Sequence, residues 1–252
     1  MTLQTYFTSE LSKQNPSKRS AVFSGDSYIG GRISKLKFLN LKSADVRNLL
    51  GKPYPFCSAG FEIQFNAFEK LWFSAKIFEL KILPLYWLES VATTELIPFA
   101  KRLSRWAISV DNWALSDGLC AHLARIFEAD PKSLLPIYQK WAQNKNPWLR
   151  RISMVGLVYY SRLRRSHPPF RLIKSFVTQH FGASEYYVQK AVGWTIREMY
   201  NVYPIETTHL LEINLHRIHP DAWFAASEKI PLKLKLKWVR KRRSLRKNSR
   251  RK

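Results

Sequence analysis

The sequence is poor in cysteine, glycine and proline, and each shortage excludes a class of protein. Two cysteines, Cys57 and Cys120, are too few for a disulfide framework or a thiolate zinc site, and they indicate a reducing compartment. With only 9 glycines and 13 prolines among 252 residues, the chain is neither collagen-like nor of low complexity.

Long hydrophobic runs are missing as well. The most apolar stretch, residues 77–100, is interrupted by Glu79, Lys81, Glu89 and Glu95, so it offers no window of about 18 apolar residues that could span a bilayer. The N-terminal residues lack the apolar core and cleavage site of a secretory signal. We therefore expect no membrane partner and a cytoplasmic location.

Acidic residues are few: 18 Asp and Glu face 42 Lys and Arg, which gives a net charge of +24. Residues 233–252 contribute six lysines and six arginines and no acid, so the rest of the chain is basic too. A basic body joined to a basic tail favours a polyanionic partner, nucleic acid first and an anionic membrane second. A charge that merely keeps the protein soluble is the alternative.

The residues that are abundant indicate a folded, helical chain. Hydrophobic residues make up 46% of the sequence and aromatic residues 14%, enough to offset the entropy of folding. Apolar residues recur at helical spacing and predict, for example, a broad stripe over residues 61–80. Asp130-Pro131 and Asn146-Pro147 are typical helix starts. Because no strand–turn–strand pattern occurs, we expect an all-α fold.

Tryptophans mark a possible repeat. Trp113 and Trp148 are 35 residues apart, and Trp148 and Trp194 are 46 apart. Two helices per unit at this period predict a HEAT-like solenoid with a concave basic face; an irregular helical bundle is the alternative. We divide the chain into a polar, loosely ordered lead-in with one helix (residues 1–31), a repeat domain (residues 32–230) and a basic, disordered tail (residues 231–252).

Familiar catalytic signatures are absent from the sequence, which contains no GxSxG, GxxxxGK[ST], GxGxxG or HExxH pattern. The nearest approach to a metal site is a helical stripe of His209, Glu212, His216 and His219. Such a stripe is more often a solvated polar face. We therefore predict neither a metal nor a cofactor.

Three other stripes combine aromatic residues with charge. In each of three segments, residues three or four positions apart share one helical face. The first face carries Trp113 and Asp117, the second Trp148 and Arg151, and the third Tyr187, Lys190, Trp194 and Arg197. Each stripe alone has a plain explanation, since a helical tryptophan usually packs in the core. Their recurrence in successive repeats suggests one shared functional face.

These stripes contain the segments WALSD (113–117), WLRR (148–151) and QKAVGWTIRE (189–198). In this order and at about these separations, they resemble the HEAT-like repeat (AlkD-type) family of DNA alkylation repair glycosylases. The resemblance covers about residues 28–228, is strongest over residues 113–200 and does not extend to the basic tail.

The resemblance implies roles for individual residues. It places the catalytic carboxylate on Asp117, its flanking tryptophans on Trp113 and Trp194, and a DNA-backbone contact on Arg151. Tyr28 matches an N-terminal tyrosine of the cleft, although the intervening spacing differs. Further nucleic-acid contacts are expected from the basic and aromatic side chains beside these positions, namely Arg150, Tyr187, Lys190 and Arg197. Tyr187 stands where relatives tend to have phenylalanine.

The implied activity is a monofunctional glycosylase that removes purines alkylated at N3 or N7 from duplex DNA. Such a base is cationic and leaves as a neutral molecule, so one carboxylate that stabilises the sugar cation and positions water suffices. The resemblance also implies attack at the sugar along an open surface, with the base left stacked. The partner would be duplex DNA containing alkylated bases, bound by a monomer associated with the nucleoid.

Two other functions fit the composition. The chain could be a non-catalytic HEAT-like scaffold for distorted or branched DNA, or a helical protein associated with RNA or ribosomes. Asp117 argues against the scaffold, because an acid in a phosphate-binding cleft opposes binding. The RNA alternative leaves the three segments unexplained.

Overall fold

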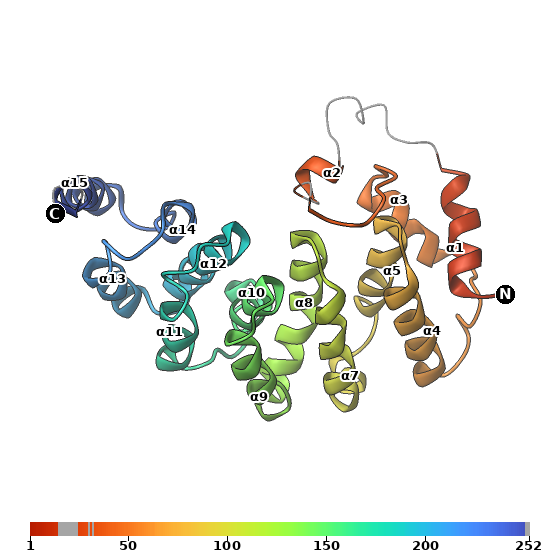
Figure 1. Cartoon of the computed structure of the whole chain (residues 1–252). Coiled ribbons are helices and arrows are strands. Elements are labelled where there is room, and N and C mark those ends of the chain that lie inside the picture. Colours follow the sequence, from red (N-terminus) through yellow and green to blue (C-terminus); the bar gives the residue numbers. More distant parts are fainter. Residues whose placement is uncertain (15–24, 30, 32, 250–252) are drawn as a thin grey trace. The chain divides into compact units, whose positions relative to one another are not determined.

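The structure is a computed structural model that describes residues 1–14, 25–29, 31 and 33–249, and these residues form an all-α fold (Figure 1). The described residues contain no β-strand; extended backbone pairs only in a single parallel bridge between Lys37 and Ile77. The prediction of an all-α protein is confirmed. In the described part of the chain, no helix has both the length and the apolar character needed to cross a membrane.

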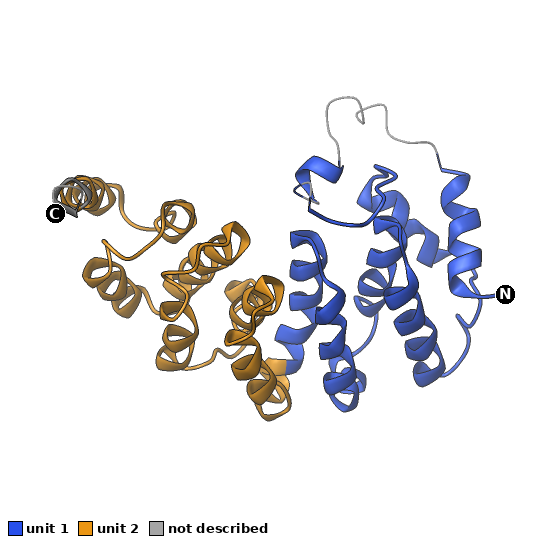
Figure 2. Ribbon diagram, in the orientation of Figure 1, with its two compact units in different colours: residues 1–126 blue, residues 127–252 orange. Residues whose placement is uncertain are grey.

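The chain divides into two compact units, residues 1–126 and residues 127–252 (Figure 2). The helices of unit 1 are α1 (Leu3–Ser12), α2 (Gly25–Tyr28), α3 (Ser43–Asn48), η2 (Leu49–Gly51), α4 (Phe61–Ser74), α5 (Phe78–Leu88), α6 (Thr93–Leu96), η3 (Ile97–Phe99), α7 (Ala100–Ser104), η4 (Arg105–Ser109) and α8 (Trp113–Ala129), whose last turn belongs to unit 2.

The core of unit 1 is built on the aromatic face of α4. Phe65, Phe68 and Trp72 recur at helical spacing and are fully buried. Trp72 stacks on Trp106, with ring centroids 5.1 Å apart, and its indole N–H donates to the Trp106 carbonyl at 3.1 Å. The polar atom of this large side chain is thereby satisfied inside the core.

The predicted stripe over residues 61–80 is two helices rather than one. α4 ends at Ser74, and α5 begins at Phe78. Between them the backbone is extended, because Lys37 N–H donates to the Lys76 carbonyl and Phe78 N–H donates to the Lys37 carbonyl, both at 2.9 Å. A distant segment therefore takes the hydrogen bonds that would have continued the helix.

The N-terminal residues are more ordered than the predicted lead-in. Thr2 caps α1 by accepting a hydrogen bond from the Thr5 N–H at 3.1 Å. Leu3, Phe7 and Leu11 share the buried face of α1, and the Phe7 ring lies 6.4 Å from that of Phe68 on α4. A loosely ordered segment with one helix was expected over residues 1–31, and its described part contains two helices, α1 and α2; residues 15–24 and 30 lie outside the described part.

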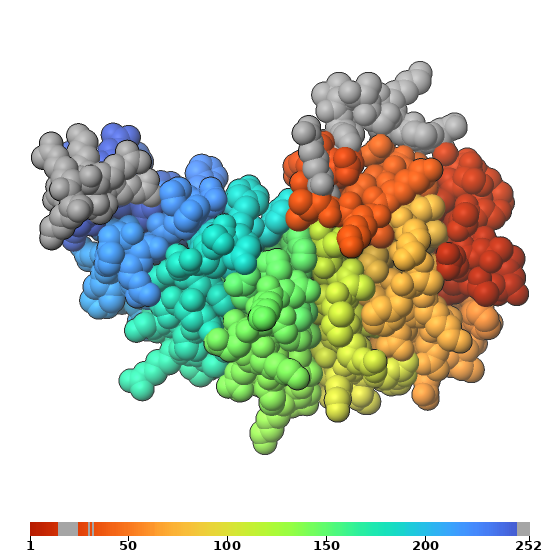
Figure 3. All heavy atoms as spheres, viewed as in Figure 1, coloured from red at the N-terminus to blue at the C-terminus, as the bar shows by residue number. Residues whose placement is uncertain are grey.

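Unit 2 is an array of helix pairs. Its helices are α9 (Pro131–Ala142), α10 (Pro147–Val155), η5 (Ser161–Leu163), α11 (Phe170–Thr178), α12 (Tyr186–Val202), α13 (Pro204–Ile213), α14 (Pro220–Ala226) and α15 (Leu232–Ser249). α12 packs between α10 and α14, while α9 packs on α10, and α11 and α13 pack on α12. In Figure 3 the surface of this unit follows the sequence in order from green to blue, as expected of stacked repeats.

Helix starts follow the sequence only in part. Asn146 caps α10, since its side chain accepts from the Trp148 N–H at 2.9 Å and Pro147 occupies the first turn. Asp130 precedes α9 but makes no capping hydrogen bond with its side chain. The proline therefore marks both starts correctly, whereas the predicted cap is present only at α10.

Gly193 explains how closely the repeats approach. A Cβ atom built on Gly193 of α12 would lie 2.2 Å from the backbone oxygen of Ala222 in α14. No side chain fits in that space, so only glycine allows the two helices to pack at this distance. The glycine of the segment QKAVGWTIRE is thus required by helix packing.

The basic tail is a helix, and the expectation of a disordered arm over residues 231–252 is wrong for its described part. α15 spans Leu232–Ser249, and Trp238 in its second turn is completely buried. Charge density alone suggested a solvated chain. The burial of one tryptophan and one arginine, Arg242, supplies the anchoring that composition does not reveal.

Candidate functional site

The first turn of α8 fixes Trp113 and Asp117 on one helical face. Buried Asn112 holds this turn, because its side-chain oxygen accepts from the Leu115 N–H at 3.0 Å and its carbonyl accepts from the Ser116 N–H at 3.1 Å. Trp113 and Asp117 are both half-buried. The helix therefore presents an aromatic ring and a carboxylate one turn apart at a rigid position, as the spacing predicted.

Tyr28 lies against Trp113. The indole N–H of Trp113 donates to the Tyr28 carbonyl at 2.9 Å, and the two rings meet edge to face with centroids 5.5 Å apart. Tyr28 remains 58% exposed. Although the two residues are 85 positions apart in the sequence, the structure brings Tyr28 to the face that carries Asp117.

Two carboxylates that sequence reasoning missed hold residues 34–39, one just before α8 and the other on α5. Asp111 accepts hydrogen bonds from the Ser34 hydroxyl at 2.9 Å and the Lys35 N–H at 2.8 Å. Glu79 of α5 accepts from the Leu39 N–H at 3.0 Å, and burial raises the pKa of this carboxyl group. Asp111 stands two residues before the WALSD segment, which was the available signal.

The stripe predicted on α12 follows the half-exposed side of that helix. Tyr187, Lys190, Trp194 and Arg197 are half-buried, whereas intervening residues such as Val192 and Thr195 are completely buried. The 3.6-residue period therefore assigned the inner and outer faces of α12 correctly.

Trp194 is part of an aromatic cluster that includes two tyrosines the sequence reasoning missed. Its ring lies 5.7 Å from that of Tyr159 and meets the ring of Tyr160 edge to face at 5.9 Å. The backbone of Tyr160 adopts the left-handed helical conformation, with φ 44° and ψ 67°. This conformation is strained for a residue with a side chain. The consecutive tyrosines 159 and 160 were the only hint in the sequence.

Glu198 holds the strained loop in place. This buried carboxylate accepts hydrogen bonds from the Ser161 N–H at 2.9 Å and the Ser161 hydroxyl at 2.7 Å, directly after Tyr160. The guanidinium of Arg197 donates to its other oxygen at 3.1 Å. The final residue of QKAVGWTIRE therefore positions the aromatic cluster around Trp194.

Several of the predicted DNA-binding cations have acidic or carbonyl partners within unit 2. Arg150 forms an ion pair with Glu185 and thereby holds the pKa of that carboxyl below its usual value. Arg197 contacts both Glu198 and Glu228, the latter at 3.2 Å. These contacts offset charges that the sequence suggested were available for phosphates.

Arg151 and Lys190 differ in accessibility. Arg151 is only 5% exposed and donates to the Tyr187 carbonyl at 3.0 Å. Lys190 is half-exposed, with its ammonium 5.8 Å from the centre of the Tyr186 ring, and forms no ion pair with the described residues. No carboxylate of the described residues therefore accompanies Lys190 at the surface of α12.

Trp148 and Tyr187 form an inward-facing pair. Trp148 is buried, and its ring lies 4.9 Å from that of Tyr187. Burial raises the pKa of the Tyr187 phenol. Trp148 is thus a packing residue, whereas Tyr187 lies at the boundary between the core and the half-exposed stripe.

The histidine stripe does not assemble a metal site. α13 ends at Ile213, so His216 lies beyond the helix that carries His209 and Glu212. His219 instead caps α14 and accepts from the Asp221 N–H at 3.2 Å. Within the described part of the chain, no group of His, Cys, Asp and Glu residues is arranged to hold a metal ion.

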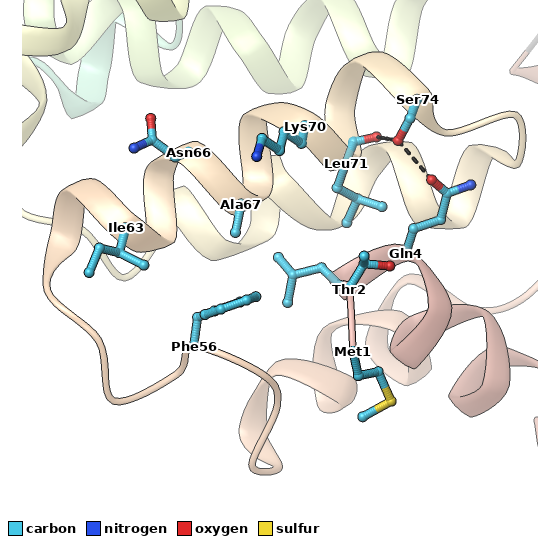
Figure 4. A pocket seen from close by; sticks show the side chains of 11 residues that line it. Met1, Thr2, Gln4, Phe56, Ile63, Asn66, Ala67, Lys70, Leu71 and Ser74 are labelled. Carbon is cyan, nitrogen blue, oxygen red and sulfur yellow. Dashed lines mark hydrogen bonds between the residues drawn. The ribbon is translucent and has the colours of Figure 1, made fainter.

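A hollow of about 450 Å³ lies between α1 and α4 (Figure 4). Phe56, Ile63 and Leu71 contribute apolar surface, and the Ser74 hydroxyl donates to the Gln4 side chain at 2.8 Å at one end. It includes none of the predicted site residues.

The stacked helix pairs define a helical-repeat protein. Two of its helices carry aromatic surface, α8 at Trp113 and α12 at Trp194. A family model described as DNA alkylation repair enzyme matches residues 10–230, and the chain belongs to this family. The match confirms the family resemblance recognised in the WALSD, WLRR and QKAVGWTIRE segments. A comparison with curated proteins found no match.

Solved structures support the same fold. A protein described as a predicted DNA alkylation repair enzyme from Enterococcus faecalis is 14% identical, with a TM-score of 0.65 over 87% of this chain and 99% of that one. The smu.31 protein of Streptococcus mutans UA159 is 16% identical, with a TM-score of 0.50 over 75% of this chain and 92% of that one. These likenesses concern the helical-repeat fold.

Proposed function

We propose that this protein is a monofunctional DNA glycosylase that hydrolyses the N-glycosidic bond of purines alkylated at N3 or N7 in duplex DNA. Membership in the DNA alkylation repair enzyme family places it in DNA alkylation repair. The observation that carries the glycosylase proposal is the rigid first turn of α8. There, Asp117 follows one turn after Trp113, whose indole N–H is bound by the Tyr28 carbonyl.

A single carboxylate is sufficient for this reaction. Alkylation at N3 or N7 makes the base cationic, so the electrons of the breaking C1′–N bond neutralise the departing base and no general acid is required. Positive charge then develops on the deoxyribose. Asp117 stabilises that charge and orients the water whose oxygen bonds to C1′, while the released proton passes to the carboxylate or to solvent.

The aromatic residues contribute affinity for the cationic nucleotide. Trp113 and Trp194 pack on the lesion nucleotide, and the negative faces of their rings attract its charge by about 0.5–2 kcal/mol each. The exposed Tyr28 ring extends the aromatic surface beside Trp113. Because the Trp113 indole N–H donates to the Tyr28 carbonyl, the Trp113 ring is oriented before DNA binds.

The phosphate contacts rest on the half-exposed side of α12. Lys190 carries the contact most directly, since it has no carboxylate partner among the described residues. Arg150 and Arg197 contribute a smaller net charge because acidic side chains accompany them. Tyr187 belongs to the same stripe, and Arg151 lies next to it, donating to the Tyr187 carbonyl. Such contacts give affinity and register without reading sequence.

The proposed substrate is duplex DNA with alkylated bases, bound by a monomer that works in the nucleoid. The decisive experiment measures release of 7-methylguanine from methylated duplex DNA under single-turnover conditions. It compares the wild type with Asp117→Asn and with the matched control Asp130→Asn, whose carboxylate precedes α9 and makes no side-chain cap.

We expect the wild type and Asp130→Asn to release the base at similar rates, and Asp117→Asn to lose at least about 100-fold in rate, as removal of one electrostatic stabiliser does. DNA affinity should persist in all three proteins. If neither the wild type nor the variants release base while all bind duplex tightly, the glycosylase proposal fails and a DNA-binding scaffold replaces it.

A further inference from the structure

The C-terminal helix α15 carries an unusual concentration of positive charge. Leu232–Ser249 includes five lysines, four arginines and no acid. The family match ends at residue 230, immediately before this helix. Its role is therefore a separate question from that of the repeat helices.

α15 is attached to the preceding helices by two residues one turn apart. Trp238 is completely buried, and its ring meets that of Trp223 in α14 at 6.4 Å. Arg242 is only 6% exposed: its guanidinium lies 4.3 Å above the Trp223 ring and donates to the backbone carbonyls of Leu215 and Ile218. These contacts fix one face of α15 against the segment from α13 to α14.

The opposite side of α15 is a cationic face. We define it by five exposed side chains, which are Lys233, Lys237, Arg240, Lys241 and Arg243. None of the five forms an ion pair with the described residues. The three lysines recur every four residues, so their Cα atoms are spaced by about 6 Å along the helix. A docked helix thus presents a regular row of unneutralised cations.

A hollow of about 240 Å³ adjoins this face. It is lined by Pro220 and Trp223 of α14 and by Val239, Arg242 and Arg243 of α15. Arg243 is exposed at this hollow, whereas Arg242 is buried and forms part of its wall. The arrangement combines a concave surface with a guanidinium group, which suits a phosphate oxygen.

We propose that the cationic face of α15 binds the phosphate backbone of duplex DNA outside the lesion site, in a register fixed by Trp238 and Arg242. This inference rests on the proposed function for its choice of partner. Duplex DNA presents about one negative charge per 1.7 Å of axis, and a rigid row of cations meets it without the entropy loss of ordering a flexible arm.

A membrane is the less suitable partner. A helix that lies in a bilayer interface presents a continuous apolar side to the lipid. In α15 the tryptophan points inward, and the exposed large apolar residues are Leu232 and Leu236, both at the N-terminal end. From Arg240 to Arg243 the exposed positions carry only charge.

The first experiment removes charge from the cationic face. Lys233→Gln/Lys237→Gln/Lys241→Gln is compared with Lys132→Gln/Lys140→Gln/Lys174→Gln, a control that removes three exposed lysines from α9 and α11. Affinity for unmodified duplex DNA is measured between 50 and 200 mM salt. Losing three phosphate contacts reduces the steepness of log affinity against log salt by about 2.7. The factor by which affinity falls from 50 to 200 mM salt should therefore be about 40-fold smaller for the α15 variant than for the wild type.

The control should change that ratio by less than about fourfold, the effect of a single contact. Equal effects of the two triple variants would overturn the proposal, because any three charges would then serve. Unmodified DNA is used so that the outcome does not depend on base release. At saturating enzyme the single-turnover excision rate of the α15 variant should match the wild type, which separates this inference from the glycosylase proposal.

The second experiment separates a docked helix from a tethered charged arm. Trp238→Ala keeps every charge but removes the buried anchor, and Trp238→Phe retains an aromatic ring. We expect Trp238→Ala to weaken duplex binding several-fold at constant salt and Trp238→Phe to restore it. Wild-type affinity in Trp238→Ala would show that the register set by docking is irrelevant and would overturn the proposal.

The membrane alternative is tested with the same triple variants. Binding to vesicles of phosphatidylcholine with phosphatidylserine is measured beside binding to DNA. The proposal predicts that the substitutions in α15 weaken DNA binding at least tenfold more than vesicle binding. Loss of vesicle binding with unchanged DNA binding would assign α15 to a membrane surface.

Discussion

Gly193→Ala tests whether the segment that carries Trp194 depends on close helix packing. The added Cβ would lie 2.2 Å from the Ala222 carbonyl oxygen and 2.9 Å from both the carbonyl carbon and the Cα of the same residue. All three atoms belong to backbone in α14, so no side-chain rotation can relieve the clash. The helices must move apart by about 1 Å, which exposes part of their shared surface.

The expected cost follows from that geometry. Overpacking a core typically destabilises a protein by 1–3 kcal/mol. Because the neighbouring atoms are backbone and cannot rotate away, we expect Gly193→Ala to lower the free energy of unfolding by about 3 kcal/mol. At about 2–4 °C per kcal/mol, the midpoint of thermal unfolding should fall by about 6–12 °C. Circular dichroism at 222 nm measures this midpoint.

Gly182→Ala supplies the control. A Cβ at Gly182, shortly before α12, meets no atom within 4 Å, so the substitution should be neutral or stabilise the chain by up to about 1 kcal/mol by restricting the unfolded state. A midpoint for Gly193→Ala within about 1 °C of the wild type would refute the packing argument. So would an equal decrease in both variants.

Three further predictions concern single side chains. Glu198→Ala should destabilise the chain by about 1–3 kcal/mol in urea unfolding, because it leaves the buried N–H and hydroxyl of Ser161 without an acceptor, while Arg197 keeps its ion pair with Glu228. Burial lowers the pKa of Lys81 from 10.5 to about 8; the folded state then binds fewer protons, so stability should rise by about 3 kcal/mol between pH 8 and 10.5 in the wild type and stay flatter in Lys81→Met. Tyr28→Leu should slow single-turnover base release about 2- to 10-fold through loss of the ring contact to Trp113, with an unchanged unfolding midpoint because Tyr28 is exposed.

Local patterns in the sequence predicted those features that depend on local structure. The proline and asparagine at 146–147 predicted the start of α10, and the spacing of Tyr187, Trp194 and Arg197 predicted the half-exposed side of α12. Both inferences need only the helical period and the chemistry of helix starts. The family resemblance depends on the same short segments, which explains why it could be recognised from them.

Features that depend on distant partners were not predictable. The break between α4 and α5 arises because Lys37 pairs with residues 76 and 78. The ion pair between Arg150 and Glu185 joins residues 35 positions apart. Because the sequence did not reveal this partner, the expected positive charge available for phosphates at Arg150 was too high. For the tail, the high charge density predicted a solvated chain, whereas Trp238 and Arg242 are buried. Their four-residue spacing was the available sign of a buried helical face.

The charge distribution in unit 2 suits a protein that recognises a cationic base. A strongly basic surface would attract phosphates but repel the positively charged lesion. Beside Trp194, the acidic partners of Arg197 are Glu198 and Glu228, which lower the local positive potential. The five cations that define the cationic face of α15, in contrast, have no acidic partners among the described residues. If both proposals hold, α15 supplies affinity for the DNA backbone, and the aromatic cluster at Trp194 remains compatible with a positively charged base.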